Sequence, residues 1–200
     1  MPRIKGLVKI LKQKGVILMP ADTIYGLFGL VRHKETIHKI AVLKGRESSN
    51  QPFIVLIAAW SQLADLGIKI NAQEKKILRK IWPGQISVVL HNKNPYLEYL
   101  HHNQDLAVRY PKNKFLTTLI KKTGPLISTS ANKTGQSPAE TITQARAIFG
   151  NQVNLYLSAG RRLPNKPSTL ISLKNGKIKI LRRGIVPIKK LKQKLNYDFI

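Results

Sequence analysis

The chain has 200 residues, which suits one domain or one domain with a short appendage. It has no cysteine, which excludes disulfides, thiolate zinc sites and a cysteine nucleophile, and it has no apolar run of about 18 residues, which excludes a transmembrane helix. Its 35 Lys and Arg residues outnumber 9 Asp and Glu residues. The formal charge of +26 favours polyanions such as RNA, DNA, nucleotides or anionic lipid, although a compositional bias towards Lys would also produce it. The N-terminus leads into an amphipathic pattern rather than an apolar signal sequence, so we expect a cytoplasmic protein without membrane contact.

Apolar periodicity predicts alternating helices and strands in the first half of the chain. Apolar residues recur at helical spacing over 4–11, and Gly15 follows as the expected C-cap. Asn71 and Glu74 have the spacing of a capping box, and Trp82-Pro83-Gly84 ends the helix that they open. The predicted elements are a helix over 4–11, strands over 16–19 and 27–31, a helix over 37–43, a strand over 53–57 and a helix over 71–81.

The second half continues this alternation and contains a hairpin signal. Asn113 opens one helix, and Thr141 with Gln144 caps another. Asn175-Gly176 lies between two apolar runs and predicts a β-hairpin. Together the elements predict an α/β single domain with a mixed sheet. The predicted elements are strands over 86–90 and 106–109, a helix from 113, a strand that ends at 126–127, a helix over 141–149, strands over 153–157, 168–173 and 177–181, and a basic helix over 188–195.

The segment Leu126-Ile127-Ser128-Thr129-Ser130-Ala131-Asn132 is the most informative stretch of the chain. A buried strand is expected to end there and to place the three hydroxyls and Asn132 in a loop. Loops at strand ends carry much of the chemistry of α/β folds, and small hydroxyls with an amide suit phosphate, ribose and a hydrated metal. A plain turn is the alternative, because Ser, Thr and Asn are also ordinary turn residues.

Other polar groups lie at the ends of predicted elements, and neither GxxxxGK[ST] nor GxGxxG is present, so any nucleotide site is built differently. Lys44 and Arg46 suit a polyphosphate, with compensation of a helix dipole as the alternative. Arg109 ends a buried strand and is a candidate clamp for a carboxylate; the alternative is an internal ion pair, although only 9 acids exist to form one. The hairpin brings Ser168 and Arg182 close enough to face one ligand.

Two further groups carry weaker signals. In Pro20-Ala21-Asp22-Thr23-Ile24-Tyr25-Gly26, a ligand-binding loop and a turn with a packed Tyr25 are both open. The histidines show no metal-ligand spacing, and we assign no role to them: His33, His38, His91, His101 and His102.

Seven motifs in this order resemble the YrdC/Sua family, the threonylcarbamoyl-AMP synthases. The family pattern reads P-T-[DE]-T-x-Y-G-L, K-x-R, W-P-G-x-x-[ST], A-V-R-x-P, S-x-S-A-N, P-S-T and L-R-x-G. Each motif is weak alone, whereas seven in order are specific, and the resemblance extends over residues 16–184. The counterparts in this chain are Pro20 to Leu27, Lys44-Gly45-Arg46, Trp82 to Ser87, Ala107 to Pro111, Ser128 to Asn132, Pro167-Ser168-Thr169 and Leu181 to Gly184.

The resemblance implies a twisted α/β fold with a concave basic face over residues 1–184. A basic tail over 185–200 is expected to pack on the same domain as a short helix, as in a short stand-alone member of the family. The implied reaction makes L-threonylcarbamoyladenylate and pyrophosphate from L-threonine, bicarbonate and ATP. A threonylcarbamoyl-transferase complex would then pass the group to adenosine in ANN-decoding tRNAs, and the basic face is a candidate contact for tRNA.

The resemblance also implies roles for individual residues, with Mg²⁺ carried by ATP rather than by a direct protein ligand. The residues expected to serve catalysis are Lys44, Arg46, Ser130 and Asn132. Those expected to bind ATP are Arg46, Asn50, Gln51, Ser130, Asn132 and Arg182. Those expected to bind threonine are Thr23, Arg109, Ser128 and Ser168.

The chain departs from the family pattern at several positions. The spacing from Arg46 to Pro52 is one residue longer than in the family pattern, which leaves the choice between Asn50 and Gln51 open. Two of the departures bear on the shape of the threonine pocket, namely Ala21 and Phe28; the others are Leu56, Asn113 and Arg183.

Two other functions compete with the synthase. A nonenzymatic protein of the same fold that binds double-stranded RNA or tRNA would explain the charge, although an aromatic content of 6% offers few stacking platforms. Carbamoyl transfer in hydrogenase maturation uses a related domain within much longer proteins, and the absence of cysteine argues against it. ATP turnover that requires threonine would belong to the synthase alone.

Overall fold

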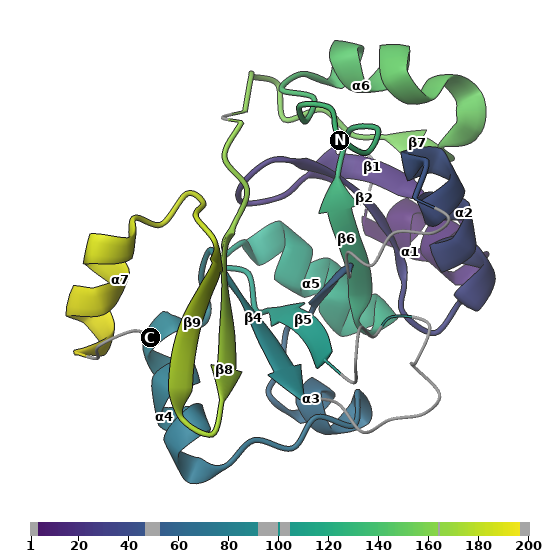
Figure 1. Cartoon of the computed structure of the whole chain (residues 1–200). Coiled ribbons are helices and arrows are strands. Elements are labelled where there is room, and N and C mark those ends of the chain that lie inside the picture. Colours follow the sequence, from purple (N-terminus) through teal and green to yellow (C-terminus); the bar gives the residue numbers. More distant parts are fainter. Residues whose placement is uncertain (1–3, 47–52, 92–99, 101–104, 164, 197–200) are drawn as a thin grey trace.

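The computed structural model describes residues 4–46, 53–91, 100, 105–163 and 165–196, and within them a mixed β-sheet forms the centre of the molecule (Figure 1). Its strands are β1 (Ile17–Pro20), β2 (Tyr25–Leu30), β3 (Ile54–Leu56), β4 (Ile86–His91), β5 (Asp105–Arg109), β6 (Leu126–Ser130), β7 (Leu155–Tyr156), β8 (Thr169–Lys174) and β9 (Lys177–Arg182). Their order is β7-β1-β2-β6-β3-β5-β4-β8-β9. β1 with β7, β3 with β5 and β4 with β8 are parallel, and the other neighbours are antiparallel. The predicted α/β domain with a mixed sheet is confirmed.

Helices flank the sheet, and none of the described helices is long and apolar enough to cross a membrane. They are α1 (Ile4–Lys12), α2 (Lys34–Lys44), α3 (Ser61–Asp65), α4 (Ala72–Ile81), α5 (Lys114–Thr123), α6 (Ile142–Phe149) and α7 (Ile188–Leu195).

Strand side chains alternate between two core clusters. Ile17 and Met19 of β1 join the cluster that contains side chains of α1 and α5, whereas Leu18 between them joins the larger cluster with α2, α4, α6 and α7. This alternation follows from the two-residue period of a strand. Because side chains on both faces of these strands are buried in one cluster or the other, the strands form continuous apolar runs in the sequence. Each fully buried Leu or Ile contributes about 1.5–3 kcal/mol of burial free energy.

The caps predicted from the sequence are present. Asn71 accepts a hydrogen bond from the Glu74 backbone N–H at 2.8 Å, and the Glu74 carboxylate accepts one from the Asn71 N–H at 3.0 Å. Thr141 and Gln144 form the same reciprocal pair at the start of α6. Asn113 caps α5 with its side-chain oxygen. Each such cap stabilises its helix by about 0.5–2 kcal/mol and fixes where it begins.

The predicted hairpin joins β8 and β9 through Asn175 and Gly176. These residues have φ values of 51° and 74°. Positive φ at both central positions is the conformation that an Asn-Gly turn favours, and its twist matches that of the strands it joins. The hairpin therefore places Ser168, just before β8, beside Arg182 at the end of β9.

Several local predictions were wrong in detail. The left-handed residue after α1 is Lys14, with φ of 62°, and not Gly15. Gly15 is needed for close approach, because a Cβ there would lie 2.5 Å from the Ile10 side chain. β2 begins at Tyr25 rather than at residue 27, because Tyr25 pairs with Pro20 of β1. β7 is shorter than the predicted 153–157, and the short helix α3 was not predicted.

The C-terminal helix α7 packs against α4. Leu191 and Leu195 are buried in the larger core cluster, and Lys80 of α4 donates a hydrogen bond to the Leu195 carbonyl at 2.9 Å. The boundary between residues 184 and 185 stays a prediction, as does the concave basic face.

Candidate active site

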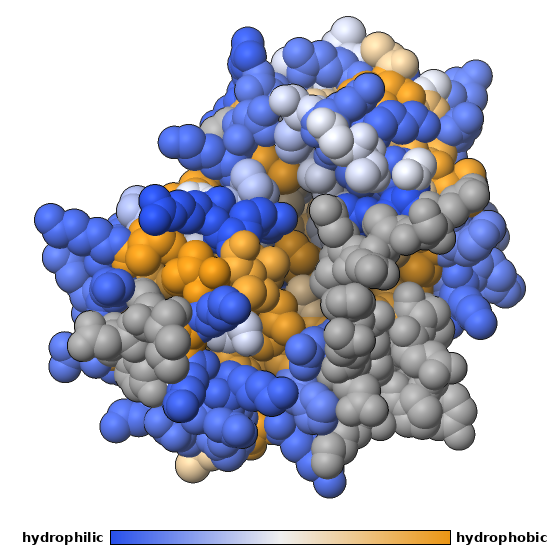
Figure 2. Space-filling view, viewed as in Figure 1, coloured by the Kyte–Doolittle hydropathy of each residue, from blue (hydrophilic) through white to orange (hydrophobic). Residues whose placement is uncertain are grey.

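A cavity of about 470 Å³ is lined by residues from segments far apart in the sequence. Apolar Leu170 and Leu181, from β8 and β9, contribute to its wall, and Figure 2 shows hydrophobic surface beside these strands, bordered by hydrophilic residues. Asn50 and Gln51, like His101 and His102, lie outside the described residues. All the other predicted site residues line this cavity: Thr23, Lys44, Arg46, Arg109, Ser128, Ser130, Asn132, Ser168 and Arg182.

The serines of the Ser-Thr-Ser segment belong to a strand and not to a loop, so that prediction was wrong. β6 runs through Ser130 because β2 pairs along its full length, with Gly26 opposite Ser130. β3 pairs on the other side, with Ile54 opposite Ser128. Ser128 is thus paired on both sides and Ser130 on the β2 side, and of the predicted loop residues Asn132 alone follows the strand. Gly26 permits the close approach, because a Cβ there would lie 2.8 Å from a β6 carbonyl oxygen.

Lys44 ties the end of α2 to β6. Only 1% of its surface is exposed. Its Nζ donates to the Ser130 carbonyl oxygen at 2.7 Å and to Asn132 Oδ1 at 2.9 Å, and it lies 3.3 Å from Ser130 Oγ. Thr134 donates its backbone N–H and its hydroxyl to the Lys44 carbonyl, at 2.8 and 2.9 Å. Gly45, with φ of 63°, ends α2 so that the chain turns between Lys44 and Arg46. The two motifs therefore form one structural unit.

The Lys44 end of the cavity is short of negative charge. Burial and, second, the charge of Arg46 lower the pKa of Lys44 to about 7. Burial also lowers the pKa of Arg46, whose guanidinium nevertheless stays charged. The groups that hold Lys44 Nζ are a carbonyl, a hydroxyl and an amide rather than a carboxylate. Burial and like-charge repulsion destabilise the charged forms of Lys44 and Arg46, so a bound anion would be stabilised here.

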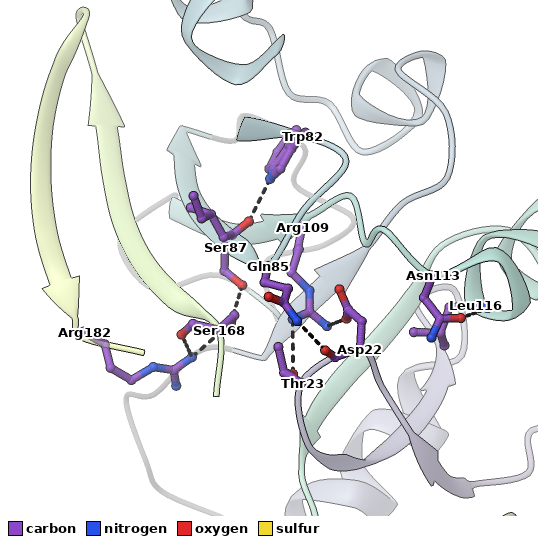
Figure 3. Close-up of polar contacts among 11 residues, drawn as sticks. Asp22, Thr23, Trp82, Gln85, Ser87, Arg109, Asn113, Leu116, Ser168 and Arg182 are labelled. Carbon is purple, nitrogen blue, oxygen red and sulfur yellow. Dashed lines mark hydrogen bonds and ion pairs between the residues drawn. The ribbon is translucent and has the colours of Figure 1, made fainter. Parts of the chain in front are cut away.

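Arg109, at the end of β5, forms the internal ion pair that the sequence left open as an alternative. Its Nη2 lies 3.1 Å from Asp22 Oδ1, and the two side chains are 4% and 8% exposed. Its Nη1 donates to Thr23 Oγ1 at 3.4 Å (Figure 3). Burial lowers the pKa of Arg109, and the Asp22 carboxylate raises it again in part. Because Arg109 also lines the cavity, the ion pair does not prevent it from contacting a ligand.

Ser168 and Arg182 meet as the hairpin predicted. Arg182 Nη2 donates to the Ser168 carbonyl at 3.0 Å and lies 3.3 Å from Ser168 Oγ. Ser168 Oγ shares a hydrogen bond of 2.8 Å with the buried hydroxyl of Ser87, the last residue of the Trp-Pro-Gly motif (Figure 3). Burial and, second, the charge of Arg109 lower the pKa of Arg182. The two guanidiniums therefore act on each other across this end of the cavity.

Sequence reasoning missed residues that shape the site without an obvious chemical signature. Thr134 and Gly135 lie two and three positions after Asn132, the end of the Ser-Asn motif, and this proximity was the available signal. Pro138, six positions after Asn132, gave no signal; all three residues line the cavity. Of the two departures from the family pattern that bear on this pocket, Ala21 lines the cavity, whereas Phe28 packs in the core cluster of α1 and α5.

Comparison with known proteins agrees with the motifs. The family model for Sua5, YciO and YrdC proteins, described as "Telomere recombination", matches residues 9–184. The chain belongs to this family. It is 32% identical over 157 residues to the threonylcarbamoyl-AMP synthase of Nitrosococcus oceani, a match that covers 78% of this chain and 84% of that protein. It is 31% identical over 176 residues to the threonylcarbamoyl-AMP synthase of Thiobacillus denitrificans, covering 86% and 92%.

The fold of this Sua5/YciO/YrdC protein also matches a solved structure, that of P. abyssi Sua5 complexed with L-threonine. The TM-score is 0.87 at 23% sequence identity. The match covers 96% of this chain and 57% of that chain, so the present protein corresponds to somewhat more than half of that Sua5. The family predicted from seven motifs is confirmed, whereas the roles of the individual site residues remain predictions.

Proposed function

We propose that this protein is a threonylcarbamoyl-AMP synthase, which joins L-threonine, bicarbonate and ATP into L-threonylcarbamoyladenylate and releases pyrophosphate. The observation that carries the proposal is a single cavity with a phosphate-suited cluster around Lys44 and a carboxylate-suited cluster around Arg109. Two relatives carry the name threonylcarbamoyl-AMP synthase, and a Sua5 of the same fold was solved with L-threonine.

The nucleotide binds at the Lys44 end in this proposal. Lys44 and Arg46 neutralise phosphate charge, and Ser130 and Asn132 contact the phosphates. Arg182, which is close enough to Arg109 for their charges to interact, contacts the nucleotide where it meets the threonine site. Mg²⁺ enters with ATP and supplies charge neutralisation at the phosphates. The hydroxyl of Ser130 and the amide oxygen of Asn132 are hard oxygen donors that suit this ion or its waters. Among the described residues no cluster of three His, Cys, Asp or Glu side chains offers an alternative metal site.

Threonine binds at the Arg109 end. The Arg109 guanidinium takes the carboxylate, because a buried guanidinium offers paired N–H donors. Its Nε is buried and has no hydrogen-bond partner among the described residues, which leaves donor capacity for a ligand. Thr23, Ser128 and Ser168 line the same cavity and would offer hydroxyls to the substrate side chain.

The chemistry needs positioning more than a protein nucleophile. The neutral amine of threonine attacks the carbon of CO₂ derived from bicarbonate, loses a proton and becomes a carbamate. A carbamate oxygen then attacks the α-phosphorus of ATP, the bond to the bridging oxygen breaks, and pyrophosphate leaves with the electron pair. Fixed cations and hydroxyls act here by orienting the reactants and neutralising charge, in a cavity that limits access of water to the carbamate.

The product serves tRNA modification in this proposal. A threonylcarbamoyl-transferase complex would transfer the group to adenosine of ANN-decoding tRNAs, and the protein would act in the cytoplasm, where tRNA is modified. The formal charge of +26 suits contact with tRNA.

Pyrophosphate release from ATP tests the proposal. We expect release only when L-threonine and bicarbonate are both present, and its loss in the double variant Lys44→Ala/Arg46→Ala. The matched control is Lys75→Ala/Arg79→Ala, which removes the same charge from the exposed face of α4 and should keep the activity. Absence of threonine-dependent release in the folded wild type would contradict the proposal and would favour the RNA-binding alternative.

A further inference from the structure

Asp22 is a buried acid in a chain with few acids. It is one of 9 Asp and Glu residues against 35 Lys and Arg residues, and only 8% of its side chain is exposed. Its Oδ1 lies 3.1 Å from Arg109 Nη2. Neither carboxylate oxygen accepts a hydrogen bond from the residues that the structure describes. Burying a carboxylate is costly unless a counter-charge lies close. Asp22 and Arg109 therefore stabilise each other as a buried ion pair.

A dedicated contact sets the backbone of Asp22. Gln85, in the turn after α4, donates its side-chain N–H to the Asp22 carbonyl (Figure 3). The same turn is anchored beside Arg109, because the Gly84 N–H donates to the carbonyl of Tyr110 at 2.8 Å. The segments that carry the carboxylate and the guanidinium are therefore both held by the Trp-Pro-Gly motif.

Asp22 lies behind Arg109 and not in the substrate cavity. Arg109 lines the cavity of about 470 Å³, whereas Asp22 lines a separate cavity of about 420 Å³. A substrate in the first cavity would meet the guanidinium and not the carboxylate. Asp22 must therefore act through Arg109, which makes it a positioning residue.

The ion pair also sets the charge of this end of the cavity. Arg182 lies near enough to Arg109 for the charge of Arg109 to lower the pKa of Arg182. With Asp22 ionised, two guanidiniums and one carboxylate leave a net charge of about one positive unit, which a single carboxylate matches. Without Asp22 the net charge would be about two units, which a dianion matches better.

We propose that Asp22 orients Arg109 and cancels one positive charge, so that the Arg109 end accepts the single carboxylate of a zwitterionic amino acid and disfavours dianions. This inference rests on the proposed function, because it takes threonine as the ligand of Arg109. Asp22 would thus affect which anions bind in the cavity without touching the substrate, through its ion pair with Arg109.

The variant Asp22→Asn keeps the shape and removes the charge. Steady-state kinetics should show a KM for L-threonine raised about tenfold and a KM for ATP within about twofold of wild type. Sulfate, used as the dianion, should inhibit competitively against threonine about ten times more strongly in the variant than in wild type. The control Asp65→Asn removes an exposed acid from α3 and should change neither quantity.

Opposite shifts for threonine and sulfate separate this role from a loss of structure. If both ligands weaken in proportion, or if the KM for threonine stays unchanged, the inference is wrong. Asp22→Glu is the second variant: it keeps the charge, so sulfate inhibition should match wild type while the KM for threonine rises. Sulfate inhibition as strong in Asp22→Glu as in Asp22→Asn would also refute it. If wild type lacks threonine-dependent turnover, the proposed function fails first, and calorimetric binding of threonine and sulfate to both variants still tests the selectivity of Asp22.

Discussion

We expect nucleotide binding to be coupled to protonation of Lys44. In the protein without ligand, burial and the charge of Arg46 lower the pKa of Lys44 to about 7. A triphosphate against Lys44 and Arg46 favours the ammonium form and raises this pKa. Wherever the pH lies between the two pKa values, the complex holds more protons than its separated partners, so binding takes up protons from the buffer.

The size of the uptake follows from the pKa of Lys44. At a pKa of about 7, the ammonium fraction is about 0.5 at pH 7 and about 0.1 at pH 8. If the bound nucleotide restores a pKa near the ordinary value of about 10.4, binding takes up about 0.5 proton at pH 7 and about 0.9 proton at pH 8. Well below pH 7 the uptake by Lys44 vanishes, because the side chain is already charged. At pH 8 the terminal phosphate, with a pKa of about 6, is fully ionised and does not contribute.

Isothermal titration calorimetry measures this uptake directly. A non-hydrolysable ATP analogue is titrated at pH 8 in buffers that differ in ionisation enthalpy, and the slope of the observed enthalpy gives the number of protons. Lys44→Met should abolish the uptake, whereas Lys75→Met, on the exposed face of α4, should keep it. Uptake near zero in wild type at pH 8, or unchanged in Lys44→Met, would refute the reasoning.

Three further substitutions test the site from other directions. Arg109→Ala should raise the KM for L-threonine about 30-fold or more with little change in the KM for ATP, because it removes a buried charged anchor; a normal KM for threonine would remove Arg109 from the substrate site. Gly184→Ala should destabilise the fold by about 1–3 kcal/mol in chemical denaturation, because its Cβ would lie 2.4 Å from the Pro167 carbonyl oxygen, whereas Gly6→Ala on α1 meets no atom within 4 Å and should be neutral or stabilising. Ser87→Ala should cost about 1–2 kcal/mol in the same assay, because it removes the buried partner of Ser168, and an unchanged free energy of unfolding would show that their 2.8 Å hydrogen bond adds nothing.

Local signals in the sequence were sufficient for elements whose ends carry their own chemistry. Asn71, Asn113 and Thr141 cap helices with side chains that act within a few residues, and Asn175-Gly176 turns the chain with backbone preferences of its own. Such contacts depend on neighbours in the sequence, so residue type and spacing predict them. The family motifs then indicated residues that line one cavity, although nothing but the fold brings their segments together.

Features that depend on residues far apart in the chain could not be predicted from local sequence patterns. Ser128 and Ser130 have turn-like composition, but both pair with β2, and Ser128 also pairs with β3, which makes them part of a strand. Asp22 gave no sign of being the partner of Arg109, because the two residues are 87 positions apart and the charge balance argued against a buried acid. The order of the strands in the described part of the chain likewise depends on long-range pairing that no local pattern encodes.

The central claim is that one cavity joins threonine, bicarbonate and ATP. Mass spectrometry of the product made from ¹³C-bicarbonate, L-threonine and ATP tests it most directly. We expect an adenylate that contains threonine and one labelled carbon, formed together with pyrophosphate. An adenylate of threonine without the labelled carbon, or formation of ADP and phosphate alone, would contradict it.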